Sequence, residues 1–124
     1  ENEWIFTCLL KLKNHVEENN TWIGHGHTFS LKESEIQFFK SSSLTHFLVS
    51  KPIELREVLK PVHIEQKSIQ FLALLPIYKN ELSYKEARGT FKMEEKLRQY
   101  QVTEKMDGYR ESVIKSRLAR LFKR

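Results

Sequence analysis

The sequence predicts an α+β domain, with a small mixed or antiparallel sheet packed against an N-terminal helix and two C-terminal helices. Residues 4–18 place apolar side chains at helical spacing. Residues 71–75 form an unbroken apolar run that Pro76 closes, as in a strand covered on both faces. Helical patterns return after Glu81. This irregular alternation of strands and helices is typical of the α+β class.

The first part of the chain predicts one helix followed by one strand. The apolar stripe of the helix consists of Ile5, Leu9, Leu12 and Val16. Asn19 and Asn20 then mark the end of the helix. Residues 22–31 change to a period of two, which predicts a strand softened at its start by Gly24 and Gly26. The side chains expected on one face of this strand are His25, His27, Phe29 and Leu31.

The middle of the chain predicts shorter elements. Residues 33–39 fit neither a helix nor a strand clearly, and the three serines at 41–43 predict a loop. Residues 44–50 predict a second strand. A short helix is expected over residues 54–59, and a short extended segment over residues 62–64.

Residues 69–75 predict the central strand of the sheet. Their last five side chains are all apolar, so neither face of the strand suits contact with water. Pro76 has no N–H to donate, so the strand ends there or lies at an edge of the sheet. Asn80 is the predicted cap of a helix that begins at Glu81.

Two helices are predicted in the C-terminal part. The first spans residues 81–99 and is expected to kink or break at Gly89. The second spans residues 106–122. Its apolar stripe consists of Tyr109, Val113, Leu118, Leu121 and Phe122. Asp107 and Arg110 are three residues apart and are expected to pair across one turn of that helix.

Length and composition describe an ordinary globular chain. Its 124 residues, 40% hydrophobic and 30% charged, correspond to one domain. Cys8 is the single cysteine, which excludes an intramolecular disulfide and fits a reducing compartment, so we expect a cytoplasmic protein. Within the apolar helix, Cys8 is expected to be a buried, unreactive thiol. No apolar run of about 18 residues is present, so no membrane span is expected.

No combination of residues predicts an enzyme. The serines at 41–43 lack a nucleophile elbow, and the four glycines form no phosphate-binding loop. We therefore expect no catalytic residues and no cofactor. His25 and His27 would point the same way on a strand, which is one way to begin a zinc site with His46, Glu33 or Glu35 as a third ligand. The alternative is a turn–strand junction with hydrogen-bonded imidazoles, and without a supporting motif we expect no metal.

Several short motifs occur in a characteristic order along the chain. They are Gly24-His25-Gly26-His27, residues 44–52, Pro76-Ile77-Tyr78, Glu81, and Asp107 with Arg110, Ser112 and Val113. In this order they resemble the suppressor of fused domain family, in particular its bacterial branch. The resemblance implies a single suppressor-of-fused-like domain over residues 1–124. It also implies that this domain is the C-terminal part of a longer family domain, with another α+β segment before it.

The resemblance to the bacterial branch implies an immunity protein or antitoxin that neutralises a cognate protein toxin by masking it. The eukaryotic branch implies instead a grip on an extended peptide, held against strands of the sheet. The chain has a net charge of +5 and a pI near 9.4, so it is not an acidic mimic of nucleic acid. An acidic toxin surface fits this charge better.

The residues predicted to bind the partner lie in the strand-end loop and in the Gly-His segment. They are Tyr78, Lys79, Glu81, Tyr84, His25 and His27. Aromatic residues are enriched at the hot spots of interfaces, although Tyr78 and Tyr84 also suit the cover of a helix–sheet junction. Glu81 has a second interpretation, as an acid that stabilises the start of a helix.

The basic C-terminal end suggests an alternative class of function. Its basic residues are Lys105, Arg110, Lys115, Arg117, Arg120, Lys123 and Arg124. A basic helix here would bind nucleic acid or an acidic regulatory partner, whereas the simpler interpretation is a solvated helix face. No helix-turn-helix or RNA-binding strand motif accompanies it, so nucleic acid is the less expected partner. The identity of the toxin and the oligomeric state stay open.

Overall fold

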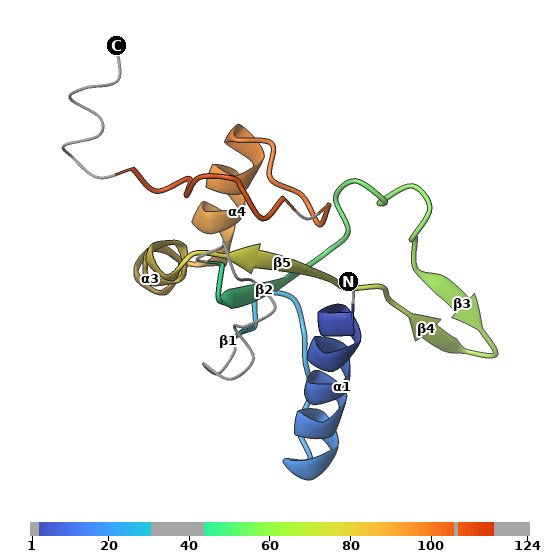
Figure 1. The fold of residues 1–124 in the computed structure, drawn as a ribbon. Helices are drawn as coiled ribbons and strands as arrows, with labels where there is room; N and C mark the ends of the chain where they lie inside the picture. The colour runs from blue at the N-terminus through green and yellow to red at the C-terminus, as the bar shows by residue number, and fades with distance from the viewer. Residues whose placement is uncertain (1–2, 31–43, 106, 116–124) are drawn as a thin grey trace.

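The computed structural model describes residues 3–30, 44–105 and 107–115 of the chain. Figure 1 shows its elements in the order α1 (Glu3–Glu18), β1 (Thr28–Ser30), β2 (His46–Ser50), β3 (Val62–Ile64), β4 (Lys67–Ile69), β5 (Ala73–Ile77), α3 (Lys79–Arg88) and α4 (Thr90–Gln99). The described residues thus form three helices and two small antiparallel sheets, which confirms the α+β prediction. None of these helices has the length and hydropathy of a membrane span.

The larger sheet has the order β1-β2-β5, and both of its strand pairs are antiparallel. Leu48 of β2 lies opposite Thr28 of β1 and Leu75 of β5. The predicted strand over residues 44–50 is therefore confirmed as β2. It is β2 that lies at the centre of the described sheet, so the assignment of residues 69–75 as the central strand is wrong. The apolar run over residues 71–75 is instead divided at the start of β5. Phe71 and Leu72 precede β5 and are exposed, whereas the other three residues belong to the strand.

Pro76 lies inside β5, and its backbone nitrogen and oxygen atoms face away from the neighbouring strand β2. It pairs in register with Phe47 of β2, and its carbonyl oxygen accepts a hydrogen bond from Arg110 at 2.9 Å. In an antiparallel strand the N and O atoms of one residue face the same side. The nitrogen of Pro76 therefore also faces away from β2, and its missing N–H removes no hydrogen bond from the sheet. Of the two outcomes predicted for Pro76, the edge position is the one observed.

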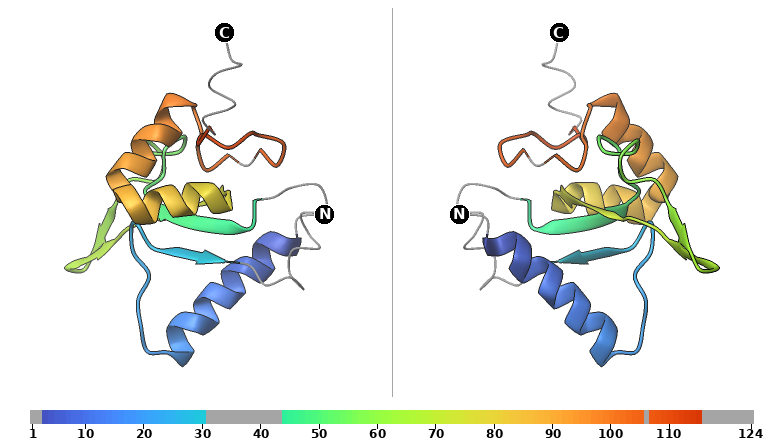
Figure 2. Two further views of the ribbon diagram at one scale, coloured as in Figure 1. Left: turned by 90° about the vertical axis from the view of Figure 1, so that its left-hand side faces the viewer. Right: turned by 90° about the vertical axis from the view of Figure 1, so that its right-hand side faces the viewer.

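Helices cover the two faces of the larger sheet unequally. Figure 2 shows α3 and α4 on one side of the sheet and α1 on the other. On the first side the buried core consists of Leu48, Leu75, Ile77, Met93, Leu97 and Val113. On the α1 side the buried residues are Cys8 and Phe47, with Phe29 and Leu74 packed against them. The alternation of Phe47 and Leu48 thus sends adjacent side chains of β2 into different halves of the core.

The predicted N-terminal helix is confirmed, but its orientation differs from the predicted stripe. Cys8 is buried, as expected, and burial raises the pKa of its thiol. The charge of nearby Lys11 has the smaller, opposite effect and lowers that pKa. Leu12 and Val16 are half-buried, whereas Leu9 is 49% exposed. The described contact with the sheet is made by Cys8, which packs with Phe47, and Leu9, the next residue along, lies at the flank of this contact.

Two other elements differ from the predictions. Residues 22–27 form no strand and have a turn at His25 and Gly26, so the strand expected over 22–31 begins only at Thr28, and His25 and His27 do not share a strand face. Gly26 has a φ of 90°, a conformation that glycine adopts without strain. Residues 54–59 form turns and not a helix. Residues 62–64 are extended, as predicted, and form the first strand of the β3–β4 hairpin.

The C-terminal helices begin and end at different places than the sequence suggests. The expected break at Gly89 is confirmed: its φ of 93° separates α3 from α4. The N-cap of α3 is Tyr78, so the assignment of Asn80 as the cap is wrong. Residues 107–115 of the predicted last helix are not helical. The predictions for residues 33–39, for the loop 41–43 and for residues 116–122 fall outside the described residues.

Candidate protein-binding surface

A buried carboxylate organises the loop at the end of β5. Glu81, the third residue of α3, has 0% exposed surface. Its oxygens accept hydrogen bonds from the N–H groups of Tyr78 at 2.7 Å and of Val113 at 3.0 Å. The Tyr78 bond is the one that an acid at the third helical position makes with the N-cap backbone. Glu81 therefore stabilises the helix start, and its side chain offers no surface to a partner.

Arg110 completes the neutralisation of Glu81. Its Nη1 and Nη2 donate to the two carboxylate oxygens at 2.8 and 2.7 Å, which is a bidentate ion pair. The expected pair of Arg110 with Asp107 is therefore wrong. Residues 107–115 make these contacts in a non-helical conformation, because both Arg110 and Val113 hydrogen-bond the carboxylate of Glu81 in place of a regular helix.

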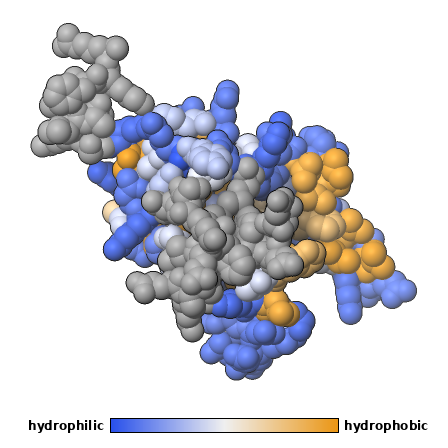
Figure 3. Space-filling model, viewed as in Figure 1, coloured by the Kyte–Doolittle hydropathy of each residue, from blue (hydrophilic) through white to orange (hydrophobic). Residues whose placement is uncertain are grey.

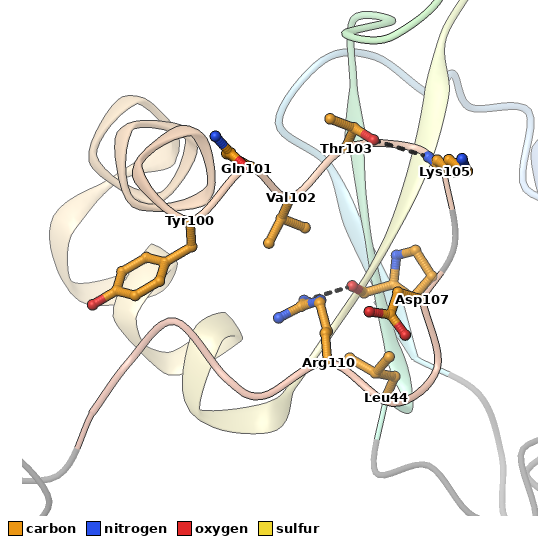
Figure 4. Close-up of a pocket in the computed structure, with 9 residues that line it drawn as sticks. Leu44, Tyr100, Gln101, Val102, Thr103, Lys105, Asp107 and Arg110 are labelled. Atoms are coloured by element: carbon orange, nitrogen blue, oxygen red, sulfur yellow. Dashed lines mark hydrogen bonds between the residues drawn. The ribbon is translucent and has the colours of Figure 1, made fainter.

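Further polar contacts attach this C-terminal segment to the start of α3. The hydroxyl of Tyr78 donates to the carbonyl oxygen of Arg110. Asn80 donates to the carbonyl oxygen of Ile114 at 3.2 Å and accepts from the hydroxyl of Ser112 at 2.7 Å. In Figure 4 the Arg110 side chain points across the small pocket of about 110 Å³ that this segment lines together with Tyr100 and its neighbours. The pocket is a by-product of this attachment.

The other residues predicted in the strand-end loop are placed differently. Lys79 is exposed at the first turn of α3. Tyr84 is half-buried and packs against the core formed by β2, β5 and α4, which is the helix–sheet cover that was its alternative interpretation. Tyr78 is half-buried, with Arg110 5.3 Å from its ring centroid. Of the strand-end residues, Lys79 is thus the one whose side chain is open to a partner, and a contact there stays a prediction.

The Gly-His segment joins α1 and the sheet to α4. His25 donates from Nε2 to the carboxylate of Glu94 in α4. His27 lies on the other side of the turn, where its Nδ1 accepts from the N–H of Gly24 at 3.3 Å and its ring lies 4.6 Å from that of Trp22. His25 is exposed, so it remains accessible, whereas His27 serves the turn. This arrangement matches the turn–strand junction with hydrogen-bonded imidazoles.

The histidines do not converge on a common centre. His46 lies on β2 and hydrogen-bonds Ser30 of β1 at 2.5 Å. Burial lowers the pKa of His46, and Lys79 lowers it further, while Glu86 opposes this. Within residues 3–30, 44–105 and 107–115, no three His, Cys, Asp or Glu side chains gather closely enough to hold a metal ion.

Glu104 is a structural residue that the sequence does not reveal. Its carboxylate accepts from the N–H groups of Ile53 and Leu55, at 2.9 Å each for the shortest contacts. Burial alone raises the pKa of Glu104, but hydrogen bonds from the backbone of Leu55, Ile53, Glu54 and Glu104 itself lower it overall. The carboxylate of Glu104 thus holds the backbone at the start of residues 54–59, and that segment folds as turns instead of the predicted helix.

Replacing Glu104 by glutamine is expected to lower the free energy of unfolding by about 1–2 kcal/mol at pH 7, because charged hydrogen bonds become neutral ones. The folded-state pKa of Glu104 is lowered, so this stabilisation is present above the unfolded pKa of about 4.3 and is lost as the pH falls through the folded pKa. Urea denaturation of both proteins between pH 7 and pH 3 measures this difference. A difference that stays constant over this range would contradict the assignment.

An apolar surface lies on the opposite side of the molecule from α3. Every residue of β3 and β4 is exposed, and the hairpin projects away from the larger sheet (Figure 1). The large apolar side chains exposed on this hairpin and the segments beside it are Leu55, Val58, Val62, Ile64, Ile69, Phe71 and Leu72. Figure 3 shows hydrophobic side chains gathered over the same region, and we call these residues the hairpin surface. Exposed apolar patches of this kind mark interaction sites.

The register of the hairpin gives it one apolar and one polar face. Val62 lies opposite Ile69, and Ile64 lies opposite Lys67, so these four share a face. His63 and Ser68 form the pair on the other face. The alternation Val-His-Ile and Lys-Ser-Ile is visible in the sequence, but its exposure is not, so this surface was missed among the predicted partner-binding residues.

The fold and the exposed apolar surface are features of a domain that binds other proteins. The family model described as suppressor of fused protein (SUFU) matches residues 1–111. The match spans most of the 124 residues, and the chain belongs to the suppressor of fused family. Membership in this family indicates a protein-binding or regulatory role. No curated protein and no solved structure matches the chain.

Proposed function

We propose that this chain is a non-catalytic immunity protein or antitoxin that acts in the cytoplasm by masking a cognate protein toxin. The observation that carries the proposal is the hairpin surface, in a chain of the suppressor of fused family. An apolar strand face that nothing in the described residues covers is suited to burial against another protein. The net charge of +5 favours association with an acidic toxin.

Binding to nucleic acid through the C-terminal end stays a prediction from the sequence. Residues 107–115 attach to α3 through Glu81, and the rest of the predicted basic helix falls outside the described residues. None of the contacts described above favours that alternative over protein binding.

Co-expression with the product of the neighbouring gene tests the proposal. We expect the wild-type chain to restore the growth of cells that the neighbouring product otherwise kills, because masking needs no turnover. Ile64→Glu, on the apolar face of the hairpin, is expected to weaken the rescue, since it buries a charge in the contact. His63→Glu, on the polar face of the same strand, is the matched control and is expected to rescue like the wild type.

Two results would count against the proposal. Either the wild-type chain, well expressed and folded, gives no rescue with a toxic neighbouring product, or the neighbouring product is not toxic at all. Isolation of the two proteins as one complex by size-exclusion chromatography is the accompanying physical measurement.

A further inference from the structure

An apolar cavity of about 310 Å³ lies between α1 and the larger sheet, beside the base of the hairpin. Its floor is formed by residues that are themselves buried: Cys8, Phe47, Ala73 and Pro76. Leu9 of α1 and Leu72 before β5, which are 49% and 41% exposed, stand at its rim. Ligand pockets commonly range from about 300 to 1,000 Å³, so this cavity has room for one bulky group and not for a larger molecule.

The cavity continues the hairpin surface towards α1. Leu72 belongs to both, and the neighbouring Phe71 is also exposed. A protein that covers the hairpin therefore also covers the mouth of the cavity. Interface hot spots form where a large side chain of one partner fills a desolvated pocket of the other, surrounded by contacts that exclude water.

One side of the cavity, near the C-terminal segment, carries a negative charge. Among the described residues that line it, Glu104 is the single charged one. Ile53 and Leu55 make three hydrogen-bond contacts with its two oxygens. Burial raises the pKa of Glu104, but the backbone hydrogen bonds that it accepts lower this pKa overall, so its carboxylate is negatively charged at neutral pH and can attract a cation. Because its bonds fix the carboxylate in place, a cation beside the cavity would meet a preorganised partner.

We infer that this cavity is the receptor for an aromatic side chain of the protein partner that is followed or preceded by a lysine or arginine. The aromatic ring fills the space between Cys8, Phe47 and Leu72, and the cation pairs with Glu104. The inference rests on the proposed protein-binding function, to which it adds the chemistry of the anchoring contact. The overall charge of the chain steers the approach of an acidic partner, whereas Glu104 selects the cation at this one position.

Two dipeptides that stand in for the anchor test the inference. N-acetyl-Trp-Lys-amide is titrated into the ¹⁵N-labelled full chain, and the amide resonances of Cys8, Leu72 and Ala73 are followed. We expect saturable shifts at these positions. N-acetyl-Trp-Glu-amide is expected to bind about threefold to fivefold more weakly, the ratio that one partly exposed ion pair provides. N-acetyl-Ala-Lys-amide, which lacks the ring, is expected to give no saturable shift.

Matched variants connect the binding to the cavity. Leu9→Trp fills the rim and is expected to weaken both tryptophan dipeptides, whereas Leu10→Trp, exposed on the same helix but outside the cavity, is the control. Glu104→Gln is expected to bring the affinities of the two tryptophan dipeptides together. Glu54→Gln, an exposed acid that does not line the cavity, should leave their ratio unchanged. The dispersion of each variant's spectrum shows that it is folded.

Four outcomes would overturn the inference. In the titration they are the absence of saturable shifts at the cavity and equal affinities of the two tryptophan dipeptides for the wild type. The third is much tighter binding of decanoate, which would indicate a site for a lipid chain, and the fourth is a dimer in sedimentation whose interface buries Leu72. The titration needs no toxin, so its failure and the failure of the growth rescue can be told apart.

Discussion

Replacing Arg110 by alanine is expected to reduce the free energy of unfolding by about 3–5 kcal/mol, the cost of leaving a buried charge without its partner. Glu81 has no exposed surface, and the side chain of Arg110 is only 11% exposed, so water does not replace the lost guanidinium. The two remaining donors, the N–H groups of Tyr78 and Val113, do not carry a full charge. Urea denaturation followed by circular dichroism gives the value.

Three further variants show whether the effect comes from the ion pair. Arg110→Lys keeps the charge but loses the bidentate geometry, so it is expected to lie between the wild type and Arg110→Ala. Glu81→Gln combined with Arg110→Ala should cost less than the sum of the single changes, because no charge stays buried. Lys92→Ala removes the exposed pair with Glu95 and is expected to change stability by less than about 1 kcal/mol. A loss below about 1 kcal/mol for Arg110→Ala would contradict the assignment.

The second large effect is expected at Leu48, whose replacement by alanine should cost about 2–5 kcal/mol. Leu48 has no exposed surface and lies at the centre of the core between β2, β5 and α4. Leu72→Ala is the matched control. It removes the same atoms from the longest apolar run of the chain, yet it should cost clearly less than Leu48→Ala because Leu72 is already 41% exposed.

The same comparison decides between two descriptions of the sheet. If residues 69–75 formed its centre, Leu72→Ala would be the more damaging change. Denaturation midpoints measured under one set of conditions are sufficient, and a larger loss for Leu72→Ala than for Leu48→Ala would contradict the strand order β1-β2-β5.

Local patterns in the sequence predict where a helix or strand forms better than they predict which elements it packs against. The helix α1 and the break at Gly89 depend on properties of adjacent residues, and both are found. The position of β5 depends on which strand pairs with which, and an apolar run carries the same signal at the centre and at the edge of a sheet. Here the edge strand is apolar because its side chains pack on both faces of the sheet: Leu75 and Ile77 pack in the core with α4, and Leu74 packs against Cys8 and Phe47.

The candidate site was harder to predict because its contacts join distant parts of the chain. Arg110 and Glu81 are 29 positions apart, and Glu104 and Ile53 are 51 apart, so neither spacing corresponds to a turn of a helix or to a hairpin. The sequence indicated Arg110 and Glu81 as notable residues and offered the helix start as one interpretation of Glu81, but it assigned the wrong partner to Arg110. Burial determines both roles, and burial follows only from the tertiary structure.

The uneven cover of the sheet has a consequence for how the molecule comes apart. The side of α3 and α4 includes most of the buried core and the Glu81 network, whereas α1 is attached mainly through Cys8 and Phe47. Regions with few buried contacts open at lower free energy than the rest of a domain. We therefore expect α1 to detach at a lower free energy than α3 and α4, which would expose Phe47 of β2 to water while the rest of the core stays packed.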